Sequence, residues 1–226
     1  MYQVQNSISR QISNKLIDWW SIHGRNFRWR KSCDPYQILI SELMLHRTRA
    51  SQVATIFDNF VERYPNLTAL SNAECIEIID ALRPLGLNWR TELILKLIDD
   101  VNKLYQGKIP EKKEDLMSLH GVGDYVASAV RCFAFGYPEV VVDTNTSRVI
   151  SRLFSFEEKG EMRRSKNVRE SYQSILDKER PQEFNYALLD LGAEICKPRS
   201  KICSICPISN FCKTACKEVV LLEKSS

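Results

Sequence analysis

Four cysteines near the end of the sequence constrain the fold more than any other feature. They are spaced C-x6-C-x2-C-x5-C, so short loops can bring their thiolates together around one soft metal centre. Structural zinc sites usually pair two C-x2-C knuckles, and this segment has only one. The spacing alone therefore leaves zinc and a [4Fe–4S] cluster equally open, with four unrelated thiols as the remaining alternative. The predicted ligands are Cys196, Cys203, Cys206 and Cys212.

The other cysteines have weaker claims to a metal. Cys216 follows closely enough to compete as a ligand. Cys33, Cys75 and Cys132 lie in helix-like patterns, which predict small core hydrophobes. We expect no disulfide framework, because the chain reads as an intracellular protein.

Composition supports that interpretation. Hydrophobic residues make up 44% and charged residues 27% of the 226 positions, which suits a soluble globular protein. No apolar run approaches the roughly 18 residues of a membrane span. The N-terminal stretch lacks the continuous apolar segment of a signal peptide, although its few acids leave a transit peptide open. We therefore expect a cytoplasmic protein without membrane contact.

Positive charge is clustered although the net charge is only +4. Such clusters are usually solvated faces, but several of them in one chain also fit a nucleic-acid-binding surface. The clusters comprise residues 25–31, 47–49, 163–169 and 197–201.

Helical periodicity predicts an all-α protein. Ile8, Leu16 and Trp19 recur at helical spacing. Asp34 followed by Pro35 is a helix start, with the aspartate as N-cap. Only Glu139–Val142 reads as extended. Further helices are expected over residues 51–64, 71–82, 90–105, 113–119, 125–135, 145–153, 168–178 and 184–196.

A turn at Gly121-Val122-Gly123 separates two of the expected helices. Glycines permit unusual backbone angles and close approach. The N–H groups of such a turn and of the next helix can bind a phosphate, although an ordinary turn between helices has the same pattern.

Asp143 ends the short apolar run that follows this turn. An acid before a helix is most often an N-cap, and Thr144-Asn145 would suit that role. The combination of turn, apolar run, aspartate and four-cysteine tail is much rarer than its parts.

These landmarks together resemble the helix–hairpin–helix (HhH-GPD) DNA glycosylase superfamily, in its iron–sulfur branch around endonuclease III and MutY. The resemblance covers nearly the whole sequence, and its cysteine spacing favours a [4Fe–4S] cluster over zinc. The matching segments are Phe27–Arg30, Asp34–Tyr36, Ile40–Leu45, Gly121–Gly123, Val142–Asn145 and Phe184–Asn185.

The resemblance implies a two-domain helical fold that binds double-stranded DNA. The expected domains are a six-helix domain with the hairpin, residues 27–136, and a discontinuous cluster-bearing domain, residues 1–26 with 137–226. Asp143 matches the catalytic acid, which would stabilise positive charge on the sugar of a flipped-out nucleotide.

Two further residues bear on the reaction. Bifunctional members carry a lysine two residues after the second hairpin glycine, where this chain has Tyr125. We therefore expect base removal without efficient strand cleavage, with a packed helix residue as the plainer interpretation of Tyr125. Glu42 matches an active-site glutamate of the family, suited to general acid work or base recognition, although a surface charge is the alternative.

Three departures separate this chain from MutY. His46-Arg47-Thr48-Arg49 stands where MutY typically has Gln-Gln-Thr and resembles the Arg-Arg-Thr of thymine–guanine mismatch enzymes. The chain also stops soon after the cysteines, and the wedge loop is shortened to residues 86–90. His120 stands where the hairpin commonly has proline, which should weaken the turn slightly.

The resemblance also implies a set of DNA contacts. Asn88 or Trp89 would fill the gap left by the flipped base, with plain core as an equal interpretation of Trp89. Arg25 and Arg47 are candidates for the orphaned guanine or its strand. The remaining expected contacts are Arg30, Gly121, Val122, Gly123, Asn145, Lys197, Arg199 and Lys201.

We therefore expect a monomeric, monofunctional DNA glycosylase that removes thymine or uracil mispaired with guanine. The alternatives are a MutY-like enzyme acting on adenine opposite guanine or oxoguanine, and a non-catalytic DNA-binding iron–sulfur protein. The expected location is the cytoplasm, in association with the nucleoid.

Overall fold

The computed structural model describes residues 2–86, 88–157 and 161–215. These residues form helices and loops without a β-strand, apart from one isolated antiparallel bridge between Cys196 and Lys201. The prediction of an all-α protein is confirmed. No helix in the described part is long and apolar enough to cross a membrane.

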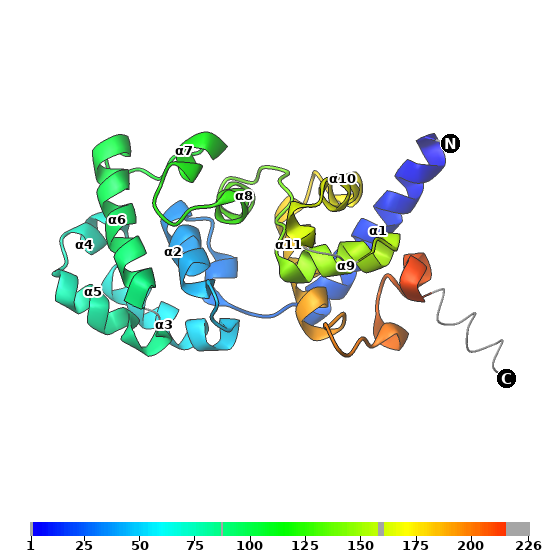
Figure 1. Ribbon diagram of the computed structural model, residues 1–226, viewed down its shortest axis with the longest axis horizontal. Coiled ribbons are helices and arrows are strands. Elements are labelled where there is room, and N and C mark those ends of the chain that lie inside the picture. Colours follow the sequence, from blue (N-terminus) through cyan, green and yellow to red (C-terminus); the bar gives the residue numbers. More distant parts are fainter. Residues whose placement is uncertain (1, 87, 158–160, 216–226) are drawn as a thin grey trace. The chain divides into compact units, whose positions relative to one another are not determined.

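The chain divides into two compact units, Asn26–Gly136 and Met1–Arg25 with Tyr137–Ser226. Figure 1 follows the elements of each along the chain. The continuous unit contains η1 (Arg28–Lys31), α2 (Pro35–Leu45), α3 (Ala50–Arg63), α4 (Leu67–Ser71), α5 (Cys75–Leu82), η2 (Arg83–Leu85), α6 (Asn88–Tyr105), α7 (Lys113–Met117) and α8 (Asp124–Phe133).

The continuous unit is organised around α2, which packs against α3, α6 and α8. The Asp34 side chain accepts a hydrogen bond from the backbone N–H of Tyr36 at 2.9 Å, so the predicted N-cap of α2 is confirmed. Nearly every residue of α2 is buried, including the apolar Ile38, Leu39 and Leu43. Helix α2 is therefore the central helix of this unit and packs against α8, which follows the hairpin turn.

The helix predicted over residues 71–82 begins four residues later than expected, as α5, and the short helix α4 before it was not predicted. The Asn66 side chain accepts a hydrogen bond from the N–H of Ala69 at 2.9 Å and starts α4 earlier. The chain then turns at Asn72 before α5 begins at Cys75. The asparagine cap thus begins a short helix that the sequence pattern did not predict, and the turn after it delays the start of α5.

The discontinuous unit contains α1 (Tyr2–His23), α9 (Thr144–Phe154), η3 (Met162–Arg164), α10 (Lys166–Ile175), α11 (Pro181–Glu194), η4 (Cys203–Ile205) and η5 (Ser209–Phe211). Helix α11 packs against both α1 and α9, and α10 packs against α1 and α9. Their shared core includes Leu16, Ile150, Tyr172 and Leu188, with Cys196, Cys206 and Cys212 at its edge.

Candidate active site

Asp143 is the N-cap of α9. Its Oδ1 accepts a hydrogen bond from the backbone N–H of Thr146 at 2.7 Å, and its own N–H donates to Thr146 Oγ1 at 2.9 Å. This reciprocal capping box fixes the aspartate at the positive end of the helix. Its second oxygen, Oδ2, accepts from Asn145 Nδ2 at 3.2 Å. Asp143 is thus a structural cap, and its half-buried carboxylate still has acceptor capacity at Oδ2.

The segment leading to Asp143 is held by a buried asparagine instead of a neighbouring strand. Asn185 of α11 accepts from the N–H of Val141 at 3.0 Å and donates to the carbonyl of Glu139 at 3.0 Å. Tyr172 OH donates to the same side chain at 2.8 Å. Asn185 is fully buried, so it supplies in the core the hydrogen bonds that a strand would supply.

Helix α9 also carries two arginines that bind the cysteine loop. Arg148 donates from Nε to the carbonyl of Cys196 at 2.8 Å and from Nη2 to Asn145 Oδ1 at 2.9 Å. Arg152 donates to the carbonyl of Lys197 at 2.8 Å and to the Cys196 sulfur at 3.4 Å. The helix capped by Asp143 is therefore also the support of the loop that begins at Cys196.

Close packing of α9 on α11 depends on a glycine. A Cβ placed at Gly192 would lie 2.8 Å from the Cβ of Asn145 and 3.1 Å from its carbonyl oxygen. Arg148 also donates to the Gly192 carbonyl, at 2.7 Å. Only glycine allows the two helices to approach this closely next to Asp143.

The four cysteines of the predicted metal centre line one small hollow, together with Arg152, Ile195 and Thr214. Burial raises the pKa of the Cys206 thiol to about 11 despite a hydrogen bond from the N–H of Ile208, and the other three thiols add to the increase. Among the described residues, no three His, Cys, Asp or Glu side chains are arranged to hold a single metal ion. Cys216 lies outside the described residues.

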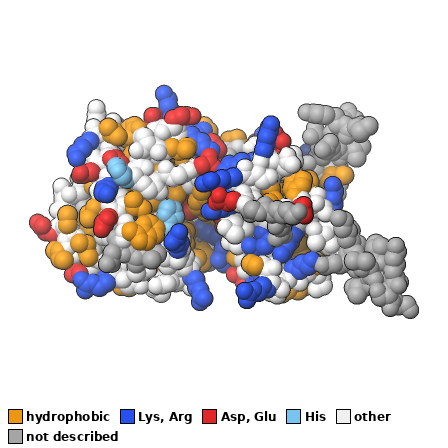
Figure 2. Space-filling view, in the orientation of Figure 1, with side chains coloured by type: hydrophobic (Ala, Val, Ile, Leu, Met, Phe, Trp, Pro, Cys, Tyr) orange, Lys and Arg blue, Asp and Glu red, His pale blue; other side chains and the backbone are white. Residues whose placement is uncertain are grey.

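The basic loop lies between the first two of these cysteines. Arg199 and Lys201 are exposed, while Lys197 is partly buried beside Arg152. On the face shown in Figure 2, lysine and arginine side chains are interspersed with acidic ones within each unit. The exposed side chains of Arg199 and Lys201 therefore give this loop local positive charge, although the net charge of the whole protein is only +4.

Arg25 has a structural partner. Its Nε lies 2.6 Å from Asp190 Oδ1, and its backbone N–H donates to Asp190 Oδ2 at 2.8 Å. Asp190 is fully buried and also accepts from Trp20 Nε1 at 3.2 Å. The ion pair ties the end of α1 to α11, and the predicted DNA contact of Arg25 stays a prediction.

The two glycines of the hairpin differ in backbone conformation and in what a side chain at each position would meet. Gly121 has φ +79°, a left-handed conformation, and a Cβ there would lie 3.2 Å from Leu93 Cδ1. Gly123 has φ −93°, and a Cβ there would meet no atom within 4 Å. Gly121 is thus required by the turn, while Gly123 leaves open space at the start of α8. Val122 between them is buried and anchors the turn.

The start of α8 has no side-chain cap. Uncapped N–H groups at the positive end of a helix favour an anion. The carboxylate of Asp124 would oppose one, but Lys113 Nζ lies 3.0 Å from Asp124 Oδ1 and balances its charge. Tyr125 follows on the first turn of α8 and is partly buried.

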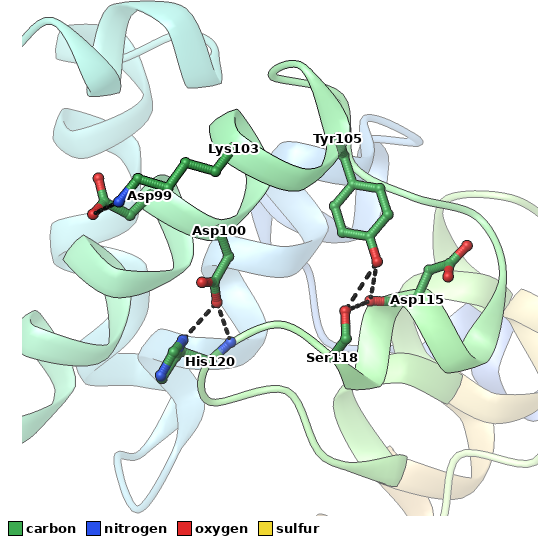
Figure 3. Close-up of polar contacts among 7 residues, drawn as sticks. All are labelled: Asp99, Asp100, Lys103, Tyr105, Asp115, Ser118 and His120. Atoms are coloured by element: carbon green, nitrogen blue, oxygen red, sulfur yellow. Dashed lines mark hydrogen bonds and ion pairs between the residues drawn. The ribbon is translucent and has the colours of Figure 1, made fainter.

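Helix α6 braces the hairpin from one side (Figure 3). Asp100 Oδ2 accepts from the N–H of His120 at 2.8 Å and contacts its Nδ1 at 2.6 Å. Partial burial alone would raise the pKa of Asp100, but these hydrogen bonds and the charge of Lys103 lower it below its ordinary value. Tyr105 OH lies 2.9 Å from Ser118 Oγ. The turn is thus held by hydrogen bonds from α6 at His120, the position at which the resemblance led us to expect a weaker turn.

Glu42 lies on α2 and is buried, with 4% of its surface exposed. Its helix packs against α8, which carries Tyr125. The surface-charge interpretation of Glu42 is therefore wrong. Burial disfavours the charged form of a carboxyl group, so a buried carboxyl group is better suited than a solvated one to donate a proton or a hydrogen bond to a nucleobase.

The chain after α2 forms a turn that contacts the start of α6. The rings of His46 and Trp89 stack with centroids 6.5 Å apart, and Arg90 is buried beneath them. Arg47 and Trp89 are exposed, and Arg30 is partly buried. Asn88 begins α6, but its side chain lies outside the described residues.

The structural roles of the residues that support the site were not predicted from the sequence. Asn185, Arg148 and Arg90 act through contacts between segments far apart in the sequence. For Arg148 and Arg152 a signal existed, because two arginines four residues apart follow Asp143 on one helix face. The others have no local signal.

A hairpin between two helices and a capped aspartate after it are both present, and the comparison with known families assigns the class of protein. Residues 40–175 match the model described as "HhH-GPD superfamily base excision DNA repair protein". The chain belongs to this superfamily, so the resemblance inferred from the sequence motifs is confirmed.

Particular relatives are similar over most of the chain. The thymine/uracil-DNA glycosylase of Pyrobaculum aerophilum is 37% identical over 88% of this chain and 89% of its own length. The thymine-DNA glycosylase of Aeropyrum pernix is 34% identical over 89% of this chain and 92% of its own. A solved structure of a thermostable thymine-DNA glycosylase matches with a TM-score of 0.86 and 32% identity, covering 96% of this chain and 99% of that one.

Proposed function

We propose that this protein is a monofunctional DNA glycosylase that removes thymine or uracil mispaired with guanine. The observation that carries the proposal is the fixed position of Asp143 at the N-terminus of α9 in a chain similar, nearly end to end, to thymine/uracil-DNA glycosylases. Its substrate would be double-stranded DNA, bound by a monomer, and its location the cytoplasmic nucleoid.

Cleavage of the N-glycosidic bond builds positive charge on the deoxyribose. The carboxylate of Asp143 stabilises this charge, because the capping box holds it in place before the reaction and no reorganisation is needed. Asn145 Nδ2 contacts Oδ2 and orients the oxygen that is not used by the cap. A water molecule completes hydrolysis and leaves an abasic site.

The base leaves the DNA stack to reach the site. Buried Glu42 recognises or protonates it, and Tyr125, which lacks an amine, leaves the abasic product without a Schiff base. The hairpin holds the strand by a phosphate at Gly123 and the uncapped start of α8. Trp89 or Asn88 fills the gap in the stack.

The four cysteines would hold a [4Fe–4S] cluster. Their common hollow and their soft donor set fit the group, and the Arg152 guanidinium already contacts the Cys196 sulfur. When bound, the cluster supplies a structural crosslink. The loop that it closes presents Lys197, Arg199 and Lys201 to DNA phosphates. Arg30 adds positive charge along the strand, and Arg25, whose charge is balanced by Asp190, is a candidate for a hydrogen-bonding contact.

A single-turnover assay tests the function. Duplexes with one T:G, U:G, A:G or A:oxoguanine pair are incubated with excess protein and then treated with alkali or left untreated. We expect alkali-dependent cleavage of the T:G and U:G duplexes only. Cleavage confined to the adenine-containing strands would instead support the adenine glycosylase alternative. Binding without cleavage of any duplex would support the non-catalytic one.

A further inference from the structure

Arg90 is the largest fully buried side chain among the described residues, with 1% of its surface exposed. Its Nη2 donates to the carbonyl of His46 and to Thr48 Oγ1, the latter at 2.6 Å. Nε and Nη1 have no hydrogen-bond partner among the described residues. Leaving two donors of a buried charged group unpaired is costly, and an apolar side chain of this size would avoid the cost. Stability alone does not account for this arginine.

The two groups that Arg90 binds flank a strained residue. Arg47 lies between His46 and Thr48 and has φ +55°, in the left-handed region that residues with a Cβ rarely adopt. Such a conformation costs on the order of 1 kcal/mol or more and persists only where the surroundings impose it. Here the backbone N–H of Thr48 donates to the carbonyl of Leu45 at 3.2 Å and closes the turn, and the hydrogen bonds from Arg90 hold the residues on both sides of Arg47. The side chain of Arg47 is exposed.

The same arginine also contacts the start of α6. Its guanidinium lies 5.9 Å from the ring centroid of Trp89, and the Trp89 ring stacks with His46. Trp89 is 38% exposed. The guanidinium of Arg90 thus connects the turn after α2 with the start of α6. Each of these segments carries one exposed side chain, Arg47 and Trp89 respectively.

We infer that Arg90 is a positioning residue that holds Arg47 in place to recognise the guanine opposite the excised base. A guanidinium donates in parallel to O6 and N7 of guanine, and no other base offers two acceptors on that edge. The strained turn fixes the direction of Arg47 before binding, so that little conformational entropy is lost on recognition. This inference rests on the proposed function and names the element that gives it specificity for guanine.

A double-mutant cycle tests the inference by binding, without catalysis. The variants are Arg90→Met, Arg47→Ala and the double variant, with Arg90→Lys as the conservative form that keeps charge and a donor. The probe is a duplex with a tetrahydrofuran abasic analogue opposite guanine or opposite adenine. The quantity measured is the ratio of the two dissociation constants.

We expect the protein to prefer guanine about tenfold or more, as one bidentate arginine contact provides. Arg90→Met and Arg47→Ala should each abolish most of this preference, and the double variant should lose no more than either one. Arg90→Lys should retain part of it. The melting temperature of Arg90→Met should not fall, because an underpaired buried charge is removed.

Two results would overturn the inference. One is an unchanged guanine preference in Arg90→Met, or in Arg90→Lys if the methionine variant does not fold. The other is a double variant whose loss of guanine preference equals the product of the fold-losses of the two single variants, since the two residues would then act independently. Base removal from T:G by the unsubstituted protein is measured separately, so failure of the proposed function is distinguished from failure of this one.

Discussion

Arg148 Nε donates to the carbonyl oxygen of Cys196 at 2.8 Å, which joins the helix capped by Asp143 to the first cysteine of the four-cysteine loop. Arg148 is 7% exposed and contacts the carbonyls of Thr144 and Gly192 as well. A charged donor shared among several carbonyls of a buried site is strongly held. Order in the cysteine loop and order at Asp143 should therefore depend on each other.

Replacing Cys203 with alanine tests this dependence. Loss of one ligand should release the cluster, destabilise the loop and weaken DNA binding by at least tenfold. Iron content, visible absorbance and affinity for an uncleavable duplex are the measurements. Cys75→Ala is the matched control, because Cys75 lies in the other unit and is exposed, like Cys33, although a core position was expected for both. The control should change none of these quantities. Full DNA affinity in an iron-free Cys203→Ala protein would contradict the structural role of the loop.

Substitutions at Asp143 should separate its cap from its chemistry. Asparagine is as good an N-cap as aspartate, so Asp143→Asn should keep the melting temperature close to that of the original protein. It carries no negative charge, and base removal should fall by at least 100-fold. Asp143→Ala should lose the same activity and in addition about 1 kcal/mol of stability. Equal melting temperatures of the two variants would mean that the capping box contributes nothing.

Tyr125→Lys should introduce strand cleavage. An amine on the first turn of α8 would stand where the bifunctional members of the superfamily carry theirs, and a Schiff base with the opened sugar becomes possible. Borohydride trapping on an abasic duplex is the measurement, with Tyr125→Met as a control of similar bulk. A lysine variant that removes the base normally and never traps would show that this position does not reach the sugar.

The two hairpin glycines should respond differently to alanine. Gly121→Ala places a Cβ at φ +79° and 3.2 Å from Leu93, so it should cost about 1–2 kcal/mol of stability. Gly123→Ala meets no atom within 4 Å and should leave the melting temperature unchanged. Its methyl group would occupy the space predicted for a phosphate, so DNA affinity should fall instead. Unaltered affinity of a folded Gly123→Ala protein would move the phosphate site elsewhere.

Local signals were sufficient for much of the site, and long-range contacts were not predictable. The cap at Asp34, the start of α8 and Asp143 could be predicted because each depends on residues a few positions away. Asn185 replaces a strand partner for Val141 across 44 positions of sequence, and no local pattern encodes that contact. The same holds for Arg90, whose burial contradicts the usual expectation for an arginine.

The brace between Asp100 and His120 should make stability depend on pH in acid. The folded-state pKa of Asp100 is lowered, so its contribution is fully present above the unfolded value of about 3.9 and is lost as the pH falls through the folded value. Hydrogen bonds to a carboxylate contribute about 1.5–3 kcal/mol each before allowance for exposure, and this side chain is 18% exposed. Asp100→Asn should therefore lower the melting temperature at pH 7 and have progressively less effect below about pH 4.

The control is to measure the effect of Asp100→Asn on the melting temperature again in a protein that carries His120→Pro. This substitution removes both donors to Asp100 while restoring the family's usual turn residue, so Asp100→Asn should have little effect in that background at every pH. An effect of Asp100→Asn that survives there undiminished would show that Asp100 acts through Lys103 instead of His120.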